Sequence, residues 1–257
     1  MSRFGNLEFG SQHEDESNAQ SSVRDEPHFL IEARTAFESG DFEKGLRAYA
    51  RVLEYNAKNA AAWTGQVRML IEMGEFHEAK VWADKALERF PTEPELLAAK
   101  AVALGRLGDL QAALAFSDAS IEERGDTPYI WLARGDVLLA REEKRAEFCF
   151  TKALALAAQD WFVHWLAARI QSFYKNITMA FKYAQQALAL DPSRSVVWLQ
   201  LGYAQQALGL AGPAQHSFTQ ARQLNPQSRE AQTALAALAQ LGLGSRLRSA
   251  WRQLFYR

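Results

Sequence analysis

The chain has 257 residues but a single cysteine, Cys149, so it cannot form an intrachain disulfide bond. An unpaired cysteine is typical of a reducing compartment. Long apolar runs are also absent, and none approaches the roughly 20 residues of a transmembrane helix. The first ten residues, MSRFGNLEFG, lack the basic and then apolar layout of a secretory signal. We therefore expect a cytoplasmic protein.

An excess of charge is lacking too, since the formal net charge is -1. A nucleic-acid backbone attracts clustered Lys and Arg, so we expect no nucleic-acid partner. The five histidines stand at no metal-ligand spacing, and no glycine-rich phosphate loop is present. Cys149 lies between two phenylalanines and is expected to be a buried, unreactive thiol. We expect no metal, no cofactor and no enzymatic activity.

What the sequence does contain is a repeat. Three columns of residues recur at intervals of 33 or 34 positions over six units. The first column is small: Gly45, Ala79, Ala113, Ala146, Ala180 and Ala214. The second runs beside it: Val52, Ala86, Ser120, Ala153, Ala187 and Ala221. The third is mostly large: Phe29, Trp63, Leu97, Trp131, His164 and Trp198. Such a register indicates one structural element that is copied and stacked into a long surface.

Each of the six repeats is predicted to consist of two helices joined by a tight turn. Glycines occupy four of the turns, where a left-handed conformation ends the first helix: Gly40, Gly74, Gly108 and Gly209. Asp41 and Asp109 follow two of these glycines and suit the N-cap of the next helix. Three repeats have a proline where the second helix should end: Pro91, Pro192 and Pro226.

This pattern resembles the tetratricopeptide repeat. The unit from Ser195 to Ser228 matches best, with these residues at the family's positions: Trp198, Leu201, Gly202, Gly209, Ala214, Phe218, Ala221 and Pro226. The resemblance covers about residues 26–241. It implies an all-α fold, a right-handed α-solenoid of about six helix-turn-helix repeats with C-terminal capping helices.

The repeats are predicted at residues 26–59, 60–93, 94–127, 128–160, 161–194 and 195–228, with a cap helix at 229–241. Residues 1–25 are polar and acidic and are predicted to be a disordered tail. Two of the repeats depart from the pattern. Arg141-Glu142-Glu143 replaces one turn glycine, where we expect an altered turn, and Lys175 stands at the next turn.

In this family the first helices line a concave groove that binds partner segments. Carried over by register, the resemblance implies that the following residues face the groove: Arg34, Arg68, Tyr129, Asp136, Phe162, Trp165, Arg169, Phe173 and Tyr203. We expect Trp165 and Arg169 to be exposed, because Trp, Tyr and Arg commonly anchor interfaces. The Lys and Asn set of a chaperone carboxylate clamp is absent. The expected partner is therefore a protein or peptide with apolar and acidic groups.

Residues 245–257 are predicted to form a basic amphipathic helix that binds a membrane or a partner through Arg246, Arg248, Trp251, Arg252 and Phe255. The same helix could instead cap the last repeat. The sequence thus favours a non-enzymatic scaffold or adaptor that binds a partner segment in its groove. Two alternatives stay open: an adaptor tethered to an anionic membrane or another polyanion by this helix, and a self-assembling homo-oligomer.

Overall fold

The computed structural model describes residues 25–123 and 125–240, and every regular element in this part of the chain is a helix. The all-α prediction is therefore confirmed. The chain divides into two compact units between Ala158 and Gln159. Unit 1 contains α1 (Glu26–Glu38), α2 (Phe42–Tyr55), α3 (Ala60–Glu72), α4 (Phe76–Arg89), α5 (Pro94–Leu107), α6 (Leu110–Glu122), α7 (Pro128–Ala140) and α8 (Ala146–Leu156). Unit 2 contains α9 (Trp161–Phe173), α10 (Ile177–Leu190), α11 (Ser195–Ala207), α12 (Ala211–Leu224) and helical residues 229–240.

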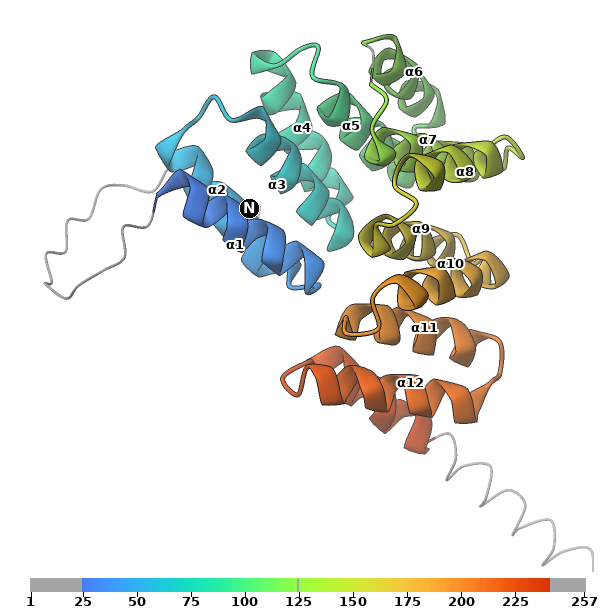
Figure 1. Ribbon diagram of the computed structural model, residues 1–257. Helices are drawn as coiled ribbons and strands as arrows, with labels where there is room; N and C mark the ends of the chain where they lie inside the picture. The colour runs from blue at the N-terminus through green and yellow to red at the C-terminus, as the bar shows by residue number, and fades with distance from the viewer. Residues whose placement is uncertain (1–24, 124, 241–257) are drawn as a thin grey trace, which may run out of the picture. The chain divides into compact units, whose positions relative to one another are not determined.

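Within each unit, neighbouring helices pack as antiparallel pairs in chain order (Figure 1). The first helix of one pair also packs against the first helix of the next, so that α5 contacts both α3 and α7, and α11 contacts α9. We call these odd-numbered helices the first-helix layer of their unit. Along each layer, residues at the same position of successive repeats lie one after another. An extended ligand can contact such a row of residues in turn.

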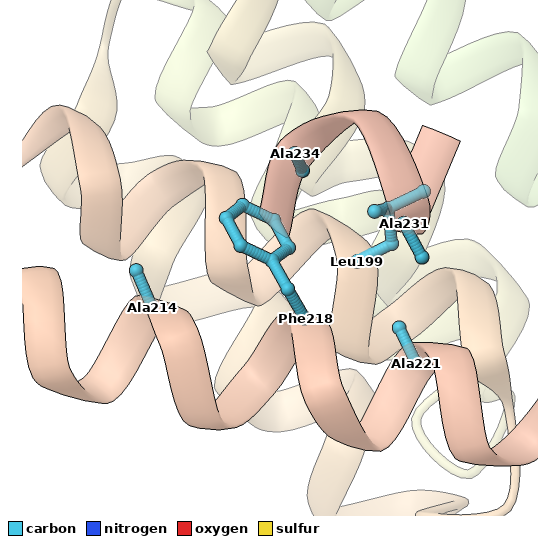
Figure 2. Close-up of a cluster of buried hydrophobic side chains, with 6 residues drawn as sticks. All are labelled: Leu199, Ala214, Phe218, Ala221, Ala231 and Ala234. Atoms are coloured by element: carbon cyan, nitrogen blue, oxygen red, sulfur yellow. The ribbon is translucent and has the colours of Figure 1, made fainter. Parts of the chain in front are cut away.

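The small residues of the repeat are buried where the two helices of a pair meet. All six residues of the first column are buried, as are all six of the second. Figure 2 shows the result in unit 2, where Phe218 of α12 packs among Ala214, Ala221 and Leu199. Ala231 and Ala234 of the following helix complete this cluster. Residues 229–240 thereby cover the apolar face that the last pair would otherwise expose to water.

Each turn between paired helices contains one residue with a positive φ, whether or not that residue is glycine. Gly108 has a φ of 91°, and Glu142 and Lys175 have φ values of 59° and 61°. In all three turns the backbone N–H of this residue donates to the carbonyl three residues earlier. The prediction of an altered turn at 141–143 is confirmed in length, because five residues separate α7 from α8, whereas two or three separate the helices of the other pairs. The left-handed residue is retained, since Glu142 adopts the conformation that glycine adopts elsewhere.

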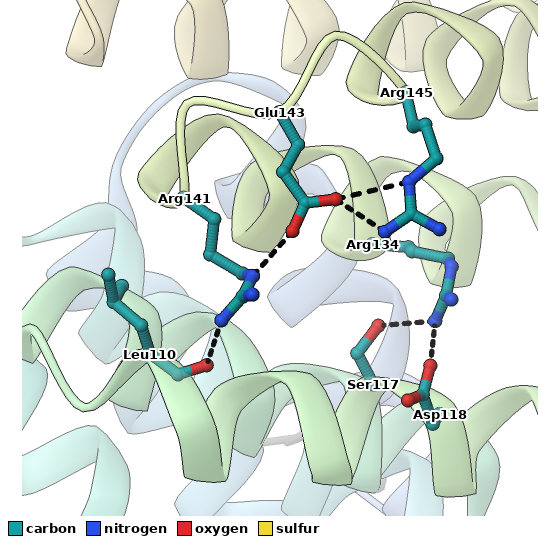
Figure 3. Close-up of polar contacts among 7 residues, drawn as sticks. All are labelled: Leu110, Ser117, Asp118, Arg134, Arg141, Glu143 and Arg145. Atoms are coloured by element: carbon teal, nitrogen blue, oxygen red, sulfur yellow. Dashed lines mark hydrogen bonds and ion pairs between the residues drawn. The ribbon is translucent and has the colours of Figure 1, made fainter.

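Polar side chains hold the turn between α7 and α8 in place (Figure 3). Glu143 accepts hydrogen bonds from Arg141 at 2.6 Å and from Arg145 at 2.5 Å. These bonds hold the pKa of the Glu143 carboxyl below its usual value. Arg141 also reaches the carbonyl of Leu110 at 3.4 Å, so the turn is joined to the start of α6. An arginine-carboxylate network thus surrounds the one turn where the repeat is a residue short.

Capping and tryptophan contacts fix where the helices begin. Asp41 and Asp109 accept hydrogen bonds from backbone N–H groups in the first turns of α2 and α6, which confirms both predicted N-caps. The indole Nε1 of Trp63 donates to the carbonyl of Ala57 at 3.0 Å, and that of Trp198 donates to the carbonyl of Pro192 at 2.8 Å. In both repeats the indole joins a first helix to the loop that precedes it.

Candidate partner-binding surface

One repeat position contributes a polar or charged side chain to the first-helix layer in most repeats. In unit 1 this position is occupied by Arg34, Arg68, Val102 and Asp136, and in unit 2 by Arg169 and Tyr203. These residues are spaced at 33 or 34 positions, as are the columns that form the core. Their surroundings differ greatly, so each is considered with its own contacts.

Arg68 of α3 lies between two aromatic rings from other first helices. Its guanidinium carbon is 3.8 Å from the ring centroid of Tyr129 on α7 and 5.0 Å from that of Phe37 on α1. Such cation-π contacts hold the planar guanidinium in one orientation. The Nε atom of Arg68 is buried without a hydrogen-bond partner, and so is Oγ1 of Thr64, one turn earlier on the same helix. We call Phe37, Thr64, Arg68 and Tyr129 the Arg68 cluster.

Tyr49 of α2 borders this cluster through an unusually close helix approach. A Cβ atom added at Gly65 of α3 would lie only 2.4 Å from Cζ of Tyr49. Glycine is therefore required for the ring to lie flat against α3. Burial raises the pKa of the Tyr49 hydroxyl, while the positive charges of Arg68 and Arg34 act in the opposite direction. The phenol thus stays protonated near the guanidinium at neutral pH.

Asp136 was predicted to face the groove, and this prediction is wrong, because only 1% of its side chain is exposed. Arg106 of α5 donates to its Oδ2 from Nη2 at 2.6 Å and from Nε at 3.2 Å. The guanidinium of Arg106 also lies 5.5 Å from the ring centroid of Phe76. The pair joins α5 to α7 and is enclosed by the fold.

Arg34 of α1 is the most exposed charge of this repeat position in unit 1, with 80% of its side chain accessible. Its Nε donates to Glu38, one helical turn later, at 2.9 Å. An exposed pair of this kind contributes little to stability and can be exchanged for a ligand contact at small cost. Arg34 is thus accessible to a partner.

In unit 2 the prediction for Trp165 is also wrong, because it is 1% exposed and belongs to the core. The rings of Phe162 and Trp161 pack on it, at centroid distances of 5.4 Å and 6.3 Å. The α9 helix is apolar on nearly every side, and its residues 163–168 are all buried. A helix with this pattern is enclosed by its neighbours. Trp165 stabilises the unit and offers no surface to a partner.

Three residues of unit 2 do leave large side chains accessible on the first-helix layer. Phe173 at the end of α9 is 43% exposed, and Tyr203 of α11 is 40% exposed. Arg169 of α9 is partly exposed, and its guanidinium carbon is 5.1 Å from the ring centroid of Trp165. Burial raises the pKa of the Tyr203 hydroxyl, with Glu230 adding to this shift and Arg169 opposing it. We call Arg169, Phe173 and Tyr203 the Tyr203 surface.

The two remaining residues with reactive side chains, His164 and Cys149, are buried inside the fold. His164 is buried, and its Nδ1 lies 3.3 Å from Oε1 of Gln186 on α10. Cys149 is a buried free thiol. Burial raises the pKa of this thiol, as expected of an unreactive cysteine.

No three His, Cys, Asp or Glu side chains within residues 25–123 and 125–240 gather as metal ligands do. Across the same residues, no helix combines the length and apolarity of a membrane span.

The five residues predicted for the C-terminal helix lie outside the described residues: Arg246, Arg248, Trp251, Arg252 and Phe255. Most of the predicted N-terminal tail also lies outside them. Within the described part, two residues that shape the candidate surface were not predicted. They are Tyr49, which lies against Gly65, and Arg106, which pairs with Asp136. The tyrosine stands four residues after Gly45 in the second helix, where the family places an aromatic, and this was the one available signal for it.

A family model described as tetratricopeptide repeat matches residues 36–103 of the chain, which lie in unit 1. No curated protein matches the sequence. Among solved structures, the human IFIT1 dimer with m7Gppp-AAAA has a TM-score of 0.53 at 18% identity, over 91% of this chain and 61% of that one. This shared fold, together with the family match, confirms the resemblance and the all-α repeat solenoid.

Two further structures are similar at lower scores. The APC/C hetero-tetramer Cut9-Hcn1 has a TM-score of 0.48 at 16% identity, and the alignment covers 82% of this chain and 49% of that one. PilW, a type IV pilus biogenesis factor, has a TM-score of 0.49 at 21% identity, covering 84% and 99%. The chain thus spans about half the length of the first of these structures and nearly all of the second.

Proposed function

We propose that this tetratricopeptide-repeat chain is a non-enzymatic scaffold that holds a segment of a partner protein against its first-helix layer. The observation that carries the proposal is the Tyr203 surface. The fold leaves two large aromatic side chains more than a third exposed beside a partly exposed arginine. Aromatic and arginine side chains of this kind supply most of the binding energy at protein interfaces.

The Arg68 cluster supports the same proposal from unit 1. A guanidinium fixed between two rings, with a buried Nε that has no partner, is prepared for a ligand rather than for internal pairing. An extended segment or a helix that follows either first-helix layer would meet side chains at the spacing of the repeats. The proposed partner therefore carries apolar side chains, and it carries acidic groups that complement the arginines.

RNA is the rival ligand, because the human IFIT1 structure holds a capped oligonucleotide. That likeness extends to the fold alone. The net charge of -1 gives no general attraction to a phosphate backbone, and Arg106 is enclosed with Asp136. We expect a fluorescein-labelled oligoadenylate to show no saturable binding at physiological salt. Tight binding would favour the nucleic-acid function instead.

A quantitative pull-down tests the proposed surface. The full chain is immobilised and incubated with extract of the native host, and recovered proteins are measured by mass spectrometry. The double variant Phe173→Ala/Tyr203→Ala should lose about tenfold or more of a specific partner, since each side chain would act as an anchor. Phe148→Ala is the matched control, because this phenylalanine is 64% exposed on the second helix α8. Equal recovery by wild type and the double variant would contradict the proposal.

The tail residues allow two further versions of this scaffold. The basic segment 245–257 would tether it to an anionic membrane surface, or it would dock on a second copy to form a homo-oligomer. We propose a cytoplasmic location for all versions, on the basis of composition. Liposome co-sedimentation and light scattering, each with and without residues 245–257, distinguish the two. Truncation that changes neither measurement would remove both versions.

A further inference from the structure

Unit 2 differs from unit 1 in the charge of its helices. No Asp or Glu occurs in α9, α10, α11 or α12, whereas each helix from α1 to α8 contains at least one. Between residues 161 and 229 the chain has six Lys and Arg residues but a single acidic residue, Asp191. The Oδ2 atom of Asp191 lies 2.7 Å from Nε of Arg194, so this acid is already paired. Unit 2 therefore carries an excess of positive charge, which attracts an anionic partner.

The edge of unit 2 at which its first helices end is exposed and partly apolar. In the turn from α11 to α12, Leu208 is 41% exposed and Leu210 is 42% exposed. The corresponding turn from α9 to α10 presents the exposed side chain of Lys175. Because α9 and α11 pack on one another as successive first helices, their turns lie on the same edge. We call Lys175, Leu208 and Leu210 the turn edge of unit 2.

Leu210 stands at a position where the fold itself favours an acidic residue. It is the N-cap residue of α12, and its side chain makes no capping hydrogen bond. In unit 1 the same position holds Asp41, Glu75 and Asp109, and both aspartates cap their helices. Leucine is among the poorest N-cap residues. A residue that gives up a cap and stays exposed indicates a contact outside the chain.

Lys175 is a second residue that the local backbone does not favour. Its φ is 61°, at the turn position that glycine occupies in four of the six repeats. Glycine adopts this left-handed conformation freely, whereas a residue with a Cβ adopts it at a cost. The turn edge therefore keeps a lysine and a leucine where glycine and aspartate would make the fold more stable. Residues that reduce stability in this way are typical of functional surfaces.

The side chains of the turn edge favour a lipid surface over a protein. Leucine is under-represented among the residues that anchor protein interfaces. At the surface of a bilayer, apolar side chains enter the boundary between headgroups and acyl chains, and Lys and Arg interact with anionic headgroups. Leu208 and Leu210 stand on either side of a tight turn, so they can enter this boundary without burial of the helices.

We propose that the turn edge of unit 2 binds an anionic lipid surface, with Leu208 and Leu210 inserted at the bilayer interface and Lys175 against the headgroups. This inference goes beyond the scaffold function and does not depend on it, because a different surface is used. It also differs from a tether through residues 245–257, because the binding residues lie in unit 2 itself.

Co-sedimentation of the full chain with lipid vesicles tests the proposal. Vesicles of phosphatidylcholine mixed with phosphatidylglycerol should bind the wild type, and vesicles of phosphatidylcholine alone should bind it much more weakly. Leu210→Asp should weaken binding to the anionic vesicles about tenfold, because it removes an inserted side chain and adds a repelled charge. Lys175→Gly removes one positive charge near the surface and should weaken binding about fivefold.

Both variants separate loss of binding from loss of structure. Leu210→Asp restores a capping residue, so its Tm should be about 2–4 °C higher than that of the wild type. Lys175→Gly relieves the left-handed strain and should also be at least as stable as the wild type. Leu224→Asp is the matched control, because Leu224 is 44% exposed at the other end of α12. That end is about 20 Å from Leu210, beyond a screening length of about 8 Å, so the control should bind like the wild type.

The outcomes separate this proposal from the others. A wild type that binds no anionic vesicles, or that binds neutral vesicles equally well, would overturn the lipid surface and leave the scaffold function untouched. Binding that Leu210→Asp retains but truncation of residues 245–257 abolishes would assign the contact to that segment instead. If Leu210→Asp binds vesicles normally but loses a protein that the wild type recovers from extract, the turn edge is a protein-binding surface and the proposal is wrong.

Discussion

The close approach of α2 to α3 predicts a measurable cost for the smallest side chain at Gly65. In Gly65→Ala the new Cβ would lie 2.4 Å from Cζ of Tyr49 and 2.6 Å from both Cε atoms. Carbon atoms in contact are normally about 3.5–4.0 Å apart, so the ring must move by about 1 Å or more. Overpacking of this kind costs about 1–3 kcal/mol. The better helix propensity of alanine returns up to about 1 kcal/mol.

The expected net loss is about 1–2 kcal/mol in the free energy of unfolding, which lowers the Tm by about 2–8 °C for a chain of this size. Thermal unfolding followed by circular dichroism measures it. Gly105→Ala on α5 is the matched control, because the nearest atoms would lie 3.7 Å from its added Cβ, which is an ordinary contact. That variant should be neutral or slightly stabilising.

A double-mutant cycle tests the cause of the loss. In a Tyr49→Leu background, the ring that the new methyl group would displace is gone, so the further change of Gly65→Ala should cost little or nothing. The reasoning is refuted if the alanine is as costly without the tyrosine as with it, or if Gly65→Ala leaves the Tm of the wild type unchanged.

Three other predictions follow from the same contacts. Arg106→Met should lower the free energy of unfolding by about 3 kcal/mol, because it leaves the buried Asp136 without its ion-pair partner; a urea titration measures this, and a wild-type midpoint would contradict it. Gly108→Ala should cost about 1 kcal/mol at a φ of 91°, whereas Glu142→Gly, at a φ of 59°, should be neutral or gain up to about 1 kcal/mol; the reverse order of stability in urea would exclude a left-handed strain. Cys149 is buried with a raised pKa and stays a thiol at pH 8, so it should react with Ellman's reagent only after unfolding; prompt reaction of the native protein would show that the thiol is accessible.

The elements of the fold were predictable because they depend on local spacing. The interval of 33 or 34 residues, the turn glycines and the two aspartate caps each act within one repeat. The turn at Glu142 was predicted to be altered, and it is altered in length, but its left-handed residue was not foreseen. The hydrogen bonds of the turn select a backbone conformation, and a residue with a Cβ can adopt it at moderate cost.

The candidate surface was less predictable because exposure depends on contacts between helices. Trp165 and Asp136 stand at groove positions by register, but both side chains are buried. The nearly continuous apolar stretch from Trp161 to Ala168 was a signal that α9 is enclosed, and register alone could not reveal it. The partner of Asp136 stands 30 residues earlier, a separation that no periodicity of the sequence relates to an ion pair.

Site-specific photo-crosslinking tests the central claim most directly, since it reports which helix layer contacts a partner. The photoreactive amino acid p-benzoylphenylalanine replaces Tyr203 on the first helix α11 in one variant and Phe148 on the second helix α8 in another. Both positions are well exposed, at 40% and 64%. After irradiation in native extract, we expect a discrete protein adduct at position 203 and none at position 148. Adducts at position 148 alone, or at neither position, would contradict a scaffold that works through its first-helix layer.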